Sequence, residues 1–97
     1  MKGYWLILGS KIADQDAQTE YGRLWAPIAA KYQARINPTK TPPLLQEARD
    51  TARVVVVEFP SLEAAKACYA DAAYQDALQY ALRASKRDLI MLEGDLG

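Results

Sequence analysis

The side chains best suited to bind a small molecule are two arginines and three aromatic residues. Arg83 and Arg53 could each clamp a carboxylate or an enolate through two parallel N–H bonds. Tyr69 and Tyr74 flank a predicted helix break, where their hydroxyls could donate to an anionic ligand. The ring of Trp5 could line the cavity in which this ligand would bind. We therefore predict a ligand site that contains Arg83, Tyr69, Tyr74, Arg53 and Trp5.

Each of these residues also has a purely structural interpretation, which stays open at this point. Either arginine can form a surface salt bridge, with Glu58 or Asp88 as the partner. The tyrosine rings can pack in the core with their hydroxyls at the surface, and Trp5 and Trp25 can simply fill the core. The prediction of a site therefore requires that the candidates meet at one cavity.

Several kinds of catalytic chemistry have no residues to support them. The sequence contains no histidine, which is the commonest general base and the commonest metal ligand. Glu58 and Asp88 would serve as bases only if they were buried, and solvated strand ends are the alternative. Cys68 is the single cysteine, so neither an intrachain disulfide nor a Cys–His pair can form. We predict no metal site and no cofactor, and we assign no catalytic residue.

Length, charge and hydropathy restrict the partners. The 97 residues predict one domain over residues 1–97. Twelve basic residues balance twelve acidic ones, without the basic excess that is usual in nucleic-acid binders. The apolar runs are shorter than the roughly 18–20 residues needed to cross a bilayer, and the N-terminus lacks a signal-peptide layout. We expect a cytoplasmic protein that binds neither nucleic acid nor membrane.

The first half of the chain predicts a strand, a long helix and a weak edge strand. Residues 4–8 are aromatic and branched, which is typical of a strand. Residues 14–32 carry apolar side chains at three- and four-residue steps, which indicates a helix. Pro27 should kink or divide this helix. Residues 34–46 include Pro38, Pro42 and Pro43, so we expect a ragged edge strand with a projecting loop.

The second half predicts two strands around a helical region. Residues 53–59 form the clearest strand, Ser61 is suited to cap the next helix, and Asp71 is suited to cap a second helical piece. Residues 89–92 form the last strand. The order β-α-β-β-α-β with right-handed crossovers favours a ferredoxin-like α+β fold, which is a four-stranded antiparallel sheet with helices on one face.

The apolar pattern of the strands predicts that a second copy of the chain packs against the sheet. The strands of an antiparallel sheet with one solvent-exposed face should alternate apolar and polar residues. Three segments of this chain are instead continuously apolar, namely residues 4–8, 54–57 and 89–92. Helices of this topology cover one face, and an uncovered apolar face would exceed the few hundred Å² that soluble monomers usually expose. A homodimer that buries the other face is the simplest solution. The alternative is a three-layer fold with helices on both faces.

The sequence resembles a known family over nearly its whole length. The matching segments are Lys2-Gly3-Tyr4-Trp5, residues 55–65, Cys68-Tyr69, Tyr74-Gln75, Arg83, residues 88–90 and Glu93-Gly94. They resemble the domain-of-unknown-function family thirteen-thirty. The resemblance implies a dimeric α+β barrel akin to the antibiotic-biosynthesis monooxygenase and chlorite-dismutase-like groups, and it implies no established reaction.

Two functional hypotheses follow. In the first, the dimer binds a small polar or aromatic metabolite, as a binding protein or as a cofactor-free enzyme. In the second, the chain is a non-catalytic interaction or structural module whose barrel is fully packed by side chains. A structure separates them, because the second hypothesis leaves no internal cavity larger than a water or two.

Overall fold

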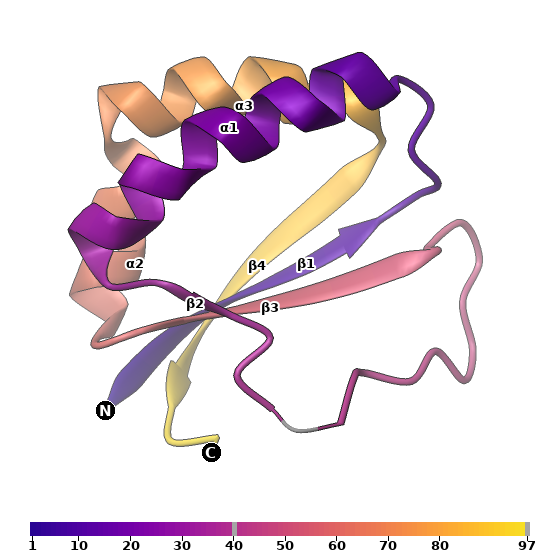
Figure 1. The fold of residues 1–97 in the computed structure, drawn as a ribbon. Coiled ribbons are helices and arrows are strands. Elements are labelled where there is room, and N and C mark those ends of the chain that lie inside the picture. The colour runs from indigo at the N-terminus through magenta and orange to yellow at the C-terminus, as the bar shows by residue number, and fades with distance from the viewer. Residues whose placement is uncertain (40, 97) are drawn as a thin grey trace.

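One antiparallel sheet lies under a layer of helices that covers a single face (Figure 1). The computed structural model describes residues 1–39 and 41–96. Within them the strands follow the spatial order β2-β3-β1-β4, with every pair of neighbours antiparallel. Their bounds are β1 Lys2–Gly9, β2 Arg35–Ile36, β3 Arg53–Phe59 and β4 Arg87–Gly94. The predicted α+β class and the ferredoxin-like order of elements are confirmed.

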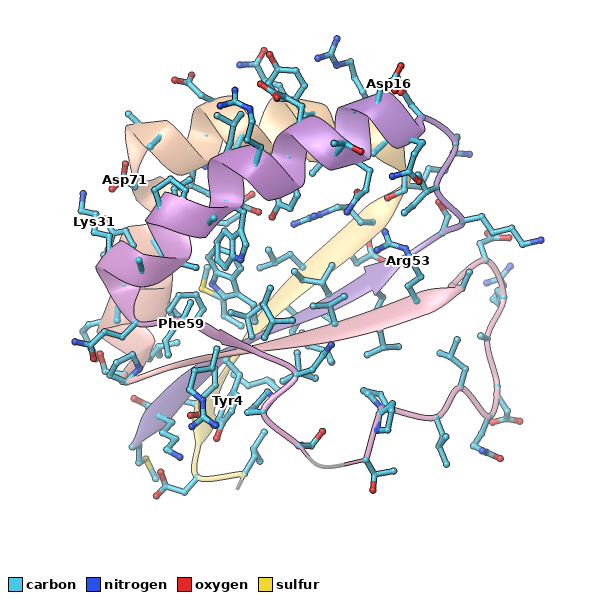
Figure 2. The ribbon with its side chains drawn as sticks, in the orientation of Figure 1. Tyr4, Asp16, Lys31, Arg53, Phe59 and Asp71 are labelled. Carbon is cyan, nitrogen blue, oxygen red and sulfur yellow. The ribbon has the colours of Figure 1, made fainter. Side chains whose placement is uncertain are left out.

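The strand register decides which side chains face the helices. Trp5 pairs with Val57 on one side and with Met91 on the other, and all three face the helix layer. Leu6 and its partners therefore point to the opposite face, since successive side chains alternate. Figure 2 shows this division, with Arg53 on the helix side of the sheet and Tyr4 on the other.

Helix α1 (Gln15–Tyr32) begins where the sequence predicts it. The Asp14 carboxylate accepts a hydrogen bond from the Ala17 N–H at 3.0 Å, and the helix ends at Gln33 in the left-handed conformation. Pro27 lies inside the helix but does not divide it. Trp25 and Ile28, on either side of the proline, are both buried in the core, and this packing offsets the backbone hydrogen bond that proline cannot donate.

The second helical region is split in two, as the sequence predicts. Helix α2 (Leu62–Ala70) is capped by Ser61, and helix α3 (Ala72–Ala84) is capped by Asp71. Asp71 also accepts hydrogen bonds from the Lys31 ammonium at 2.8 Å and from the Tyr32 hydroxyl, both at the end of α1. Figure 2 shows Lys31 and Asp71 together at this junction. One carboxylate thus starts α3 and ties it to α1.

The predicted edge strand over residues 34–46 is wrong in its extent, because β2 contains only Arg35 and Ile36. The backbone N–H and side-chain oxygen of Asn37 both bond to Val56, and Asn37 itself adopts a positive φ of 51°. This conformation turns the chain away from β3. The prolines that follow cannot donate to a ladder, so pairing does not resume. Lys40, which falls within the predicted range 34–46, and Gly97 lie outside the described residues.

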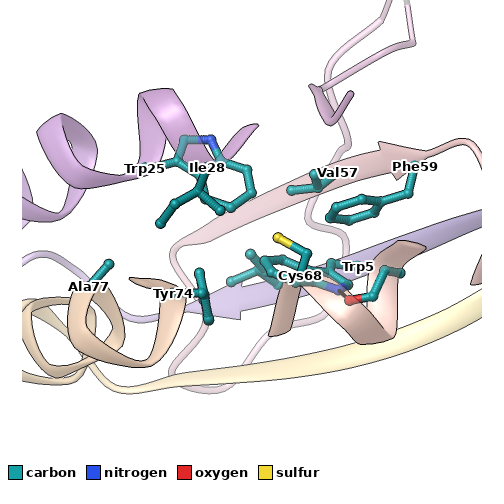
Figure 3. Close-up of a cluster of buried hydrophobic side chains, with 10 residues drawn as sticks. Trp5, Trp25, Ile28, Val57, Phe59, Cys68, Tyr74 and Ala77 are labelled. Atoms are coloured by element: carbon teal, nitrogen blue, oxygen red, sulfur yellow. Dashed lines mark hydrogen bonds between the residues drawn. The ribbon is translucent and has the colours of Figure 1, made fainter. Parts of the chain in front are cut away.

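The core is an aromatic cluster between sheet and helices (Figure 3). The Trp5 ring lies 4.9 Å from that of Phe59 and 5.0 Å from that of Tyr74, measured between centroids. The indole N–H of Trp5 donates to the Ala65 carbonyl at 3.2 Å, so its polar atom is satisfied. Cys68 is buried here, and burial raises the pKa of its thiol to about 12, which agrees with a packing role. No helix in the described residues is long and apolar enough to cross a membrane.

Candidate functional site

A cavity of about 200 Å³ lies between the sheet and α1, and we call it the helix-side pocket. The strands provide its floor and α1 provides one wall. An arginine stands at the start of each of the strands β3 and β4 that flank β1. The lining residues are Trp5, Ile7, Gln18, Tyr21, Gly22, Trp25, Ile36, Arg53, Val55, Val57 and Arg87.

Aromatic rings make up much of the wall of the pocket. The rings of Trp5 and Trp25 are 5.6 Å apart and inclined at 42°, with Trp5 fully buried beneath the pocket and Trp25 8% exposed. Tyr21 stands edge-on to Tyr74, with 6.2 Å between ring centroids. Such surfaces bind flat apolar groups with little loss of side-chain freedom, because the rings are already fixed by packing.

A hydrogen-bonded chain of polar groups borders this wall. The Arg87 guanidinium donates to the Tyr74 hydroxyl at 2.9 Å, and the hydroxyls of Tyr74 and Tyr21 are 3.1 Å apart. The same guanidinium lies over the Tyr21 ring at 5.2 Å, a cation–π contact. Burial, reinforced by Tyr21, raises the pKa of Tyr74 far above its usual value. The Tyr74 hydroxyl is therefore neutral and keeps a proton that it can donate.

Arg53 is held by neutral groups. Its Nη2 donates to the Ser85 hydroxyl at 3.2 Å and its Nε donates to the Ser10 carbonyl at 3.3 Å. The salt bridge to Glu58, which the sequence left open, does not form. Glu58 points to the other face of the sheet, where Lys2 and Arg35 lie 3.5 Å from its carboxylate.

The structure brings some of the predicted site residues together and separates others. Trp5 and Arg53 line the helix-side pocket, and Tyr74 reaches its edge through the contacts to Arg87 and Tyr21. Tyr69 packs against Trp5 and Tyr74 but does not line the pocket. Arg83 lies outside the pocket, on the exposed side of α3, with its guanidinium 4.6 Å from the Tyr80 ring.

Four of the lining residues that sequence reasoning missed have informative positions. Tyr21 lies among the apolar positions of the helix predicted over residues 14–32, and Gln18 lies one turn before it. Arg87 carried a detectable signal, because it is a basic residue at the start of a strand with an apolar centre. Gly22 carried another, since a glycine in the middle of a helix costs roughly 0.5–1 kcal/mol relative to alanine and so needs a reason.

A metal site finds no support in the described residues, which hold no group of three or more histidine, cysteine, aspartate or glutamate side chains. The groups that converge on the helix-side pocket are instead guanidinium, phenol and indole. These groups donate hydrogen bonds or stack, so the arrangement is suited to bind and orient an organic ligand.

Comparison with known proteins assigns the chain to a family. Residues 2–95 match the family described as domain of unknown function DUF1330. No curated protein matches the chain. Among solved structures, it is similar to a dimeric ferredoxin-like protein of unknown function from Jannaschia, with a TM-score of 0.72, 14% identity, and coverage of 97% of this chain and 100% of the other.

Two further structures share the fold. A protein of unknown function from Rhodopseudomonas palustris has a TM-score of 0.69 and 19% identity, covering 99% of this chain and 84% of the other. A cofactor-independent oxygenase from Streptomyces nogalater, solved as a variant, has a TM-score of 0.67 and 9% identity, covering 99% and 95%. At such identities the likeness is one of fold.

Proposed function

The chain belongs to the DUF1330 family, and from its helix-side pocket we propose that it is a homodimer that binds a small aromatic or polar metabolite. The single observation that carries this proposal is an aromatic-walled cavity with two arginines at its polar end. A protein of similar fold from Streptomyces nogalater is a cofactor-independent oxygenase, which supports the proposal of a ligand site.

The helix-side pocket is large enough to hold a ligand. A water molecule takes up roughly 30 Å³ of liquid, so about 200 Å³ has room for several waters or one compact ligand. Pockets for drug-sized ligands usually span about 300–1,000 Å³. The helix-side pocket therefore suits a ligand of one or two rings.

Support for a dimer comes from the face of the sheet that the helices leave open. Ile90 and Leu92 are 44% and 40% exposed there, and Leu6, Val54 and Val56 lie beside them only partly covered. A contiguous apolar surface of this kind is typical of an interface, and a two-fold axis needs only one self-complementary patch. The Jannaschia protein with this fold is dimeric. Two sheets facing each other in this way would form an α+β barrel.

The test is a thermal-shift screen of one- and two-ring aromatic compounds against the purified full chain, followed by tryptophan fluorescence, since both tryptophans line the pocket. A true ligand at one hundred times its Kd stabilises the folded state by about 2.7 kcal/mol. For a chain of this length that raises Tm by roughly 10 °C or more.

A blocking variant assigns any hit to the pocket. Gly22 lines the pocket on α1, and a Cβ built there meets no atom within 4 Å. Gly22→Leu should therefore fold normally and obstruct the cavity, whereas Gly22→Ala should leave it open. The proposal fails if no compound in the screen stabilises the protein, or if Gly22→Leu binds the hit as tightly as the wild type does.

A further inference from the structure

We propose that Arg53 and Arg87 form a two-arginine clamp for the carboxylate of a flat aromatic acid, with the aromatic body of the acid against the wall that Tyr21 and Trp25 form. This inference rests on the proposed function and names the ligand class of the same pocket.

The strand register places the two arginines on either side of one residue. Gly9, at the end of β1, pairs with Arg53 of β3 on one side and with Arg87 of β4 on the other. Directly paired residues of neighbouring strands point to the same face, so both guanidiniums belong to the helix side of the sheet. Both line the helix-side pocket.

Gly9 allows the two side chains to converge. A Cβ at this position would lie 2.8 Å from Nη2 and 3.4 Å from Cζ of Arg53. The guanidinium therefore crosses directly over the glycine, from β3 toward Ser85 at the end of α3, to which it donates at 3.2 Å. Ser85 comes two residues before Arg87, so Arg53 reaches across β1 toward the second arginine.

The hydrogen-bond partners of these two arginines are neutral, whereas Arg23 and Arg35 are paired with carboxylates. Arg23 and Arg35 lie within 2.6 Å and 3.5 Å of glutamate carboxylates. Arg53 and Arg87 donate hydrogen bonds only to hydroxyl and carbonyl oxygens, and neither forms an ion pair within residues 1–39 and 41–96. Two half-buried positive charges beside an apolar cavity are costly unless an anion joins them.

The donor geometry suits a carboxylate. A guanidinium presents a planar fork that matches the two oxygens of a carboxylate, and both arginines keep N–H groups that no protein oxygen accepts in the described residues. The Tyr74 hydroxyl fixes the position of Arg87. The remaining wall is apolar and aromatic, so the rest of the ligand is a flat ring system rather than a sugar or a phosphate ester.

The test compares acids with their neutral amides by calorimetric titration of the full chain. Benzoate and benzamide form one pair of probes, and 2-naphthoate and 2-naphthamide form the other. We expect at least one acid to bind ten-fold or more tightly than its amide. Arg87→Gln and Arg53→Gln should each weaken that acid at least ten-fold and leave the amide nearly unchanged.

Matched variants distinguish specific binding by the two arginines from a nonspecific effect of positive charge on affinity. Arg83→Gln removes the same charge outside the pocket and should leave the Kd of the acid within two-fold. Arg53→Lys keeps the charge but loses the planar fork, so it should weaken the acid although the fold is intact by circular dichroism. Gly9→Ala should also weaken the acid, because it displaces the Arg53 guanidinium.

Each contrary result has a distinct meaning. If amides bind as tightly as acids, or if the wider screen finds only neutral ligands, the clamp is overturned and the pocket remains a binding site. If Arg83→Gln weakens the acid as much as Arg87→Gln does, the clamp is overturned as a general charge effect. If neither the probes nor the wider screen yields any ligand, the clamp and the proposed function both fall.

Discussion

The two faces of the sheet are made of similarly apolar residues, yet the chain covers them differently. On the helix side Trp5 is 0% exposed and lies within an aromatic cluster. On the open side Ile90, one strand away, is 44% exposed. The difference shows that the hydrophobicity of a strand does not determine whether its side chains are buried within the monomer. The helical connections of this topology cover only one face of the sheet. Side chains of the same apolar strand are therefore buried in the core on that face and left exposed to solvent on the other.

The open face is itself not uniform. At one end Tyr4 is only 2% exposed, and its hydroxyl accepts a hydrogen bond from the Leu96 N–H at 3.1 Å. The neighbouring Glu58 carboxylate lies between Lys2 and Arg35. The chain thus covers this end with its own C-terminal segment and charged groups. Uncovered apolar surface is left on the edge strand β4, at Ile90 and Leu92, and on the adjoining parts of β1 and β3, where a second copy could pack.

The largest effect is expected on the helix side. Trp5→Ala should lower the free energy of unfolding by about 3–5 kcal/mol, because it removes the centre of the aromatic cluster and leaves a cavity. Urea unfolding followed by far-ultraviolet circular dichroism measures this loss. Leu6→Ala, the next residue on the other face, should cost less, and its cost should depend on protein concentration. Equal costs at every concentration would contradict the distinction between the faces.

The second prediction concerns the open face. Ile90→Lys places a charge in the proposed dimer contact, so the particle mass should fall from twice 10.8 kDa to 10.8 kDa. Light scattering after size-exclusion chromatography at micromolar concentration measures it. Leu82→Lys is the control, since Leu82 is 59% exposed on α3 and far from that face. A wild-type protein that is already a 10.8 kDa particle would refute the dimer.

The sequence predicts the fold well where a local signal and the global packing agree. Asp14, Ser61 and Asp71 each precede a helix and accept a backbone N–H as capping residues. The extent of β2 was not predictable in this way. It depends on the positive φ of Asn37 and on its bonds to Val56, which are tertiary contacts.

The candidate site was predictable only in part. Trp5, Arg53 and Arg83 were all selected by residue type; the structure places the first two at the helix-side pocket and Arg83 outside it. Arg87 joins Arg53 because both pair with Gly9. That relation requires the strand register, and register depends on which strands are neighbours, which residue types do not reveal.

The third prediction tests the connection between α1 and α3. The hydrogen bonds from Lys31 and Tyr32, with that from the Ala73 N–H, lower the pKa of the Asp71 carboxyl well below its usual value. Because the folded-state pKa is the lower one, the charge stabilises the protein above about pH 4 and this stability is lost as pH falls through the folded pKa. Asp71→Asn, which keeps a capping side chain, should lower the denaturation midpoint at pH 7.

The pH dependence of this effect identifies its cause. The difference in midpoint between wild type and Asp71→Asn should narrow as the pH is lowered below about 4. Glu47→Gln, an exposed loop variant with the same charge change, should shift the midpoint less at pH 7. A difference that stays constant between pH 7 and pH 3 would show that the carboxylate charge does not tie the helices together.

The smallest predicted effect falls on the helix that walls the pocket. Gly22 lies in the interior of α1, and a Cβ there meets nothing within 4 Å. Gly22→Ala should therefore raise the free energy of unfolding by roughly 0.5–1 kcal/mol, because alanine loses less backbone entropy in a helix. Urea denaturation measures the gain, with Ala26→Gly on the same helix expected to lose a similar amount. If Gly22→Ala were destabilising, the glycine would be needed for packing rather than for an open pocket.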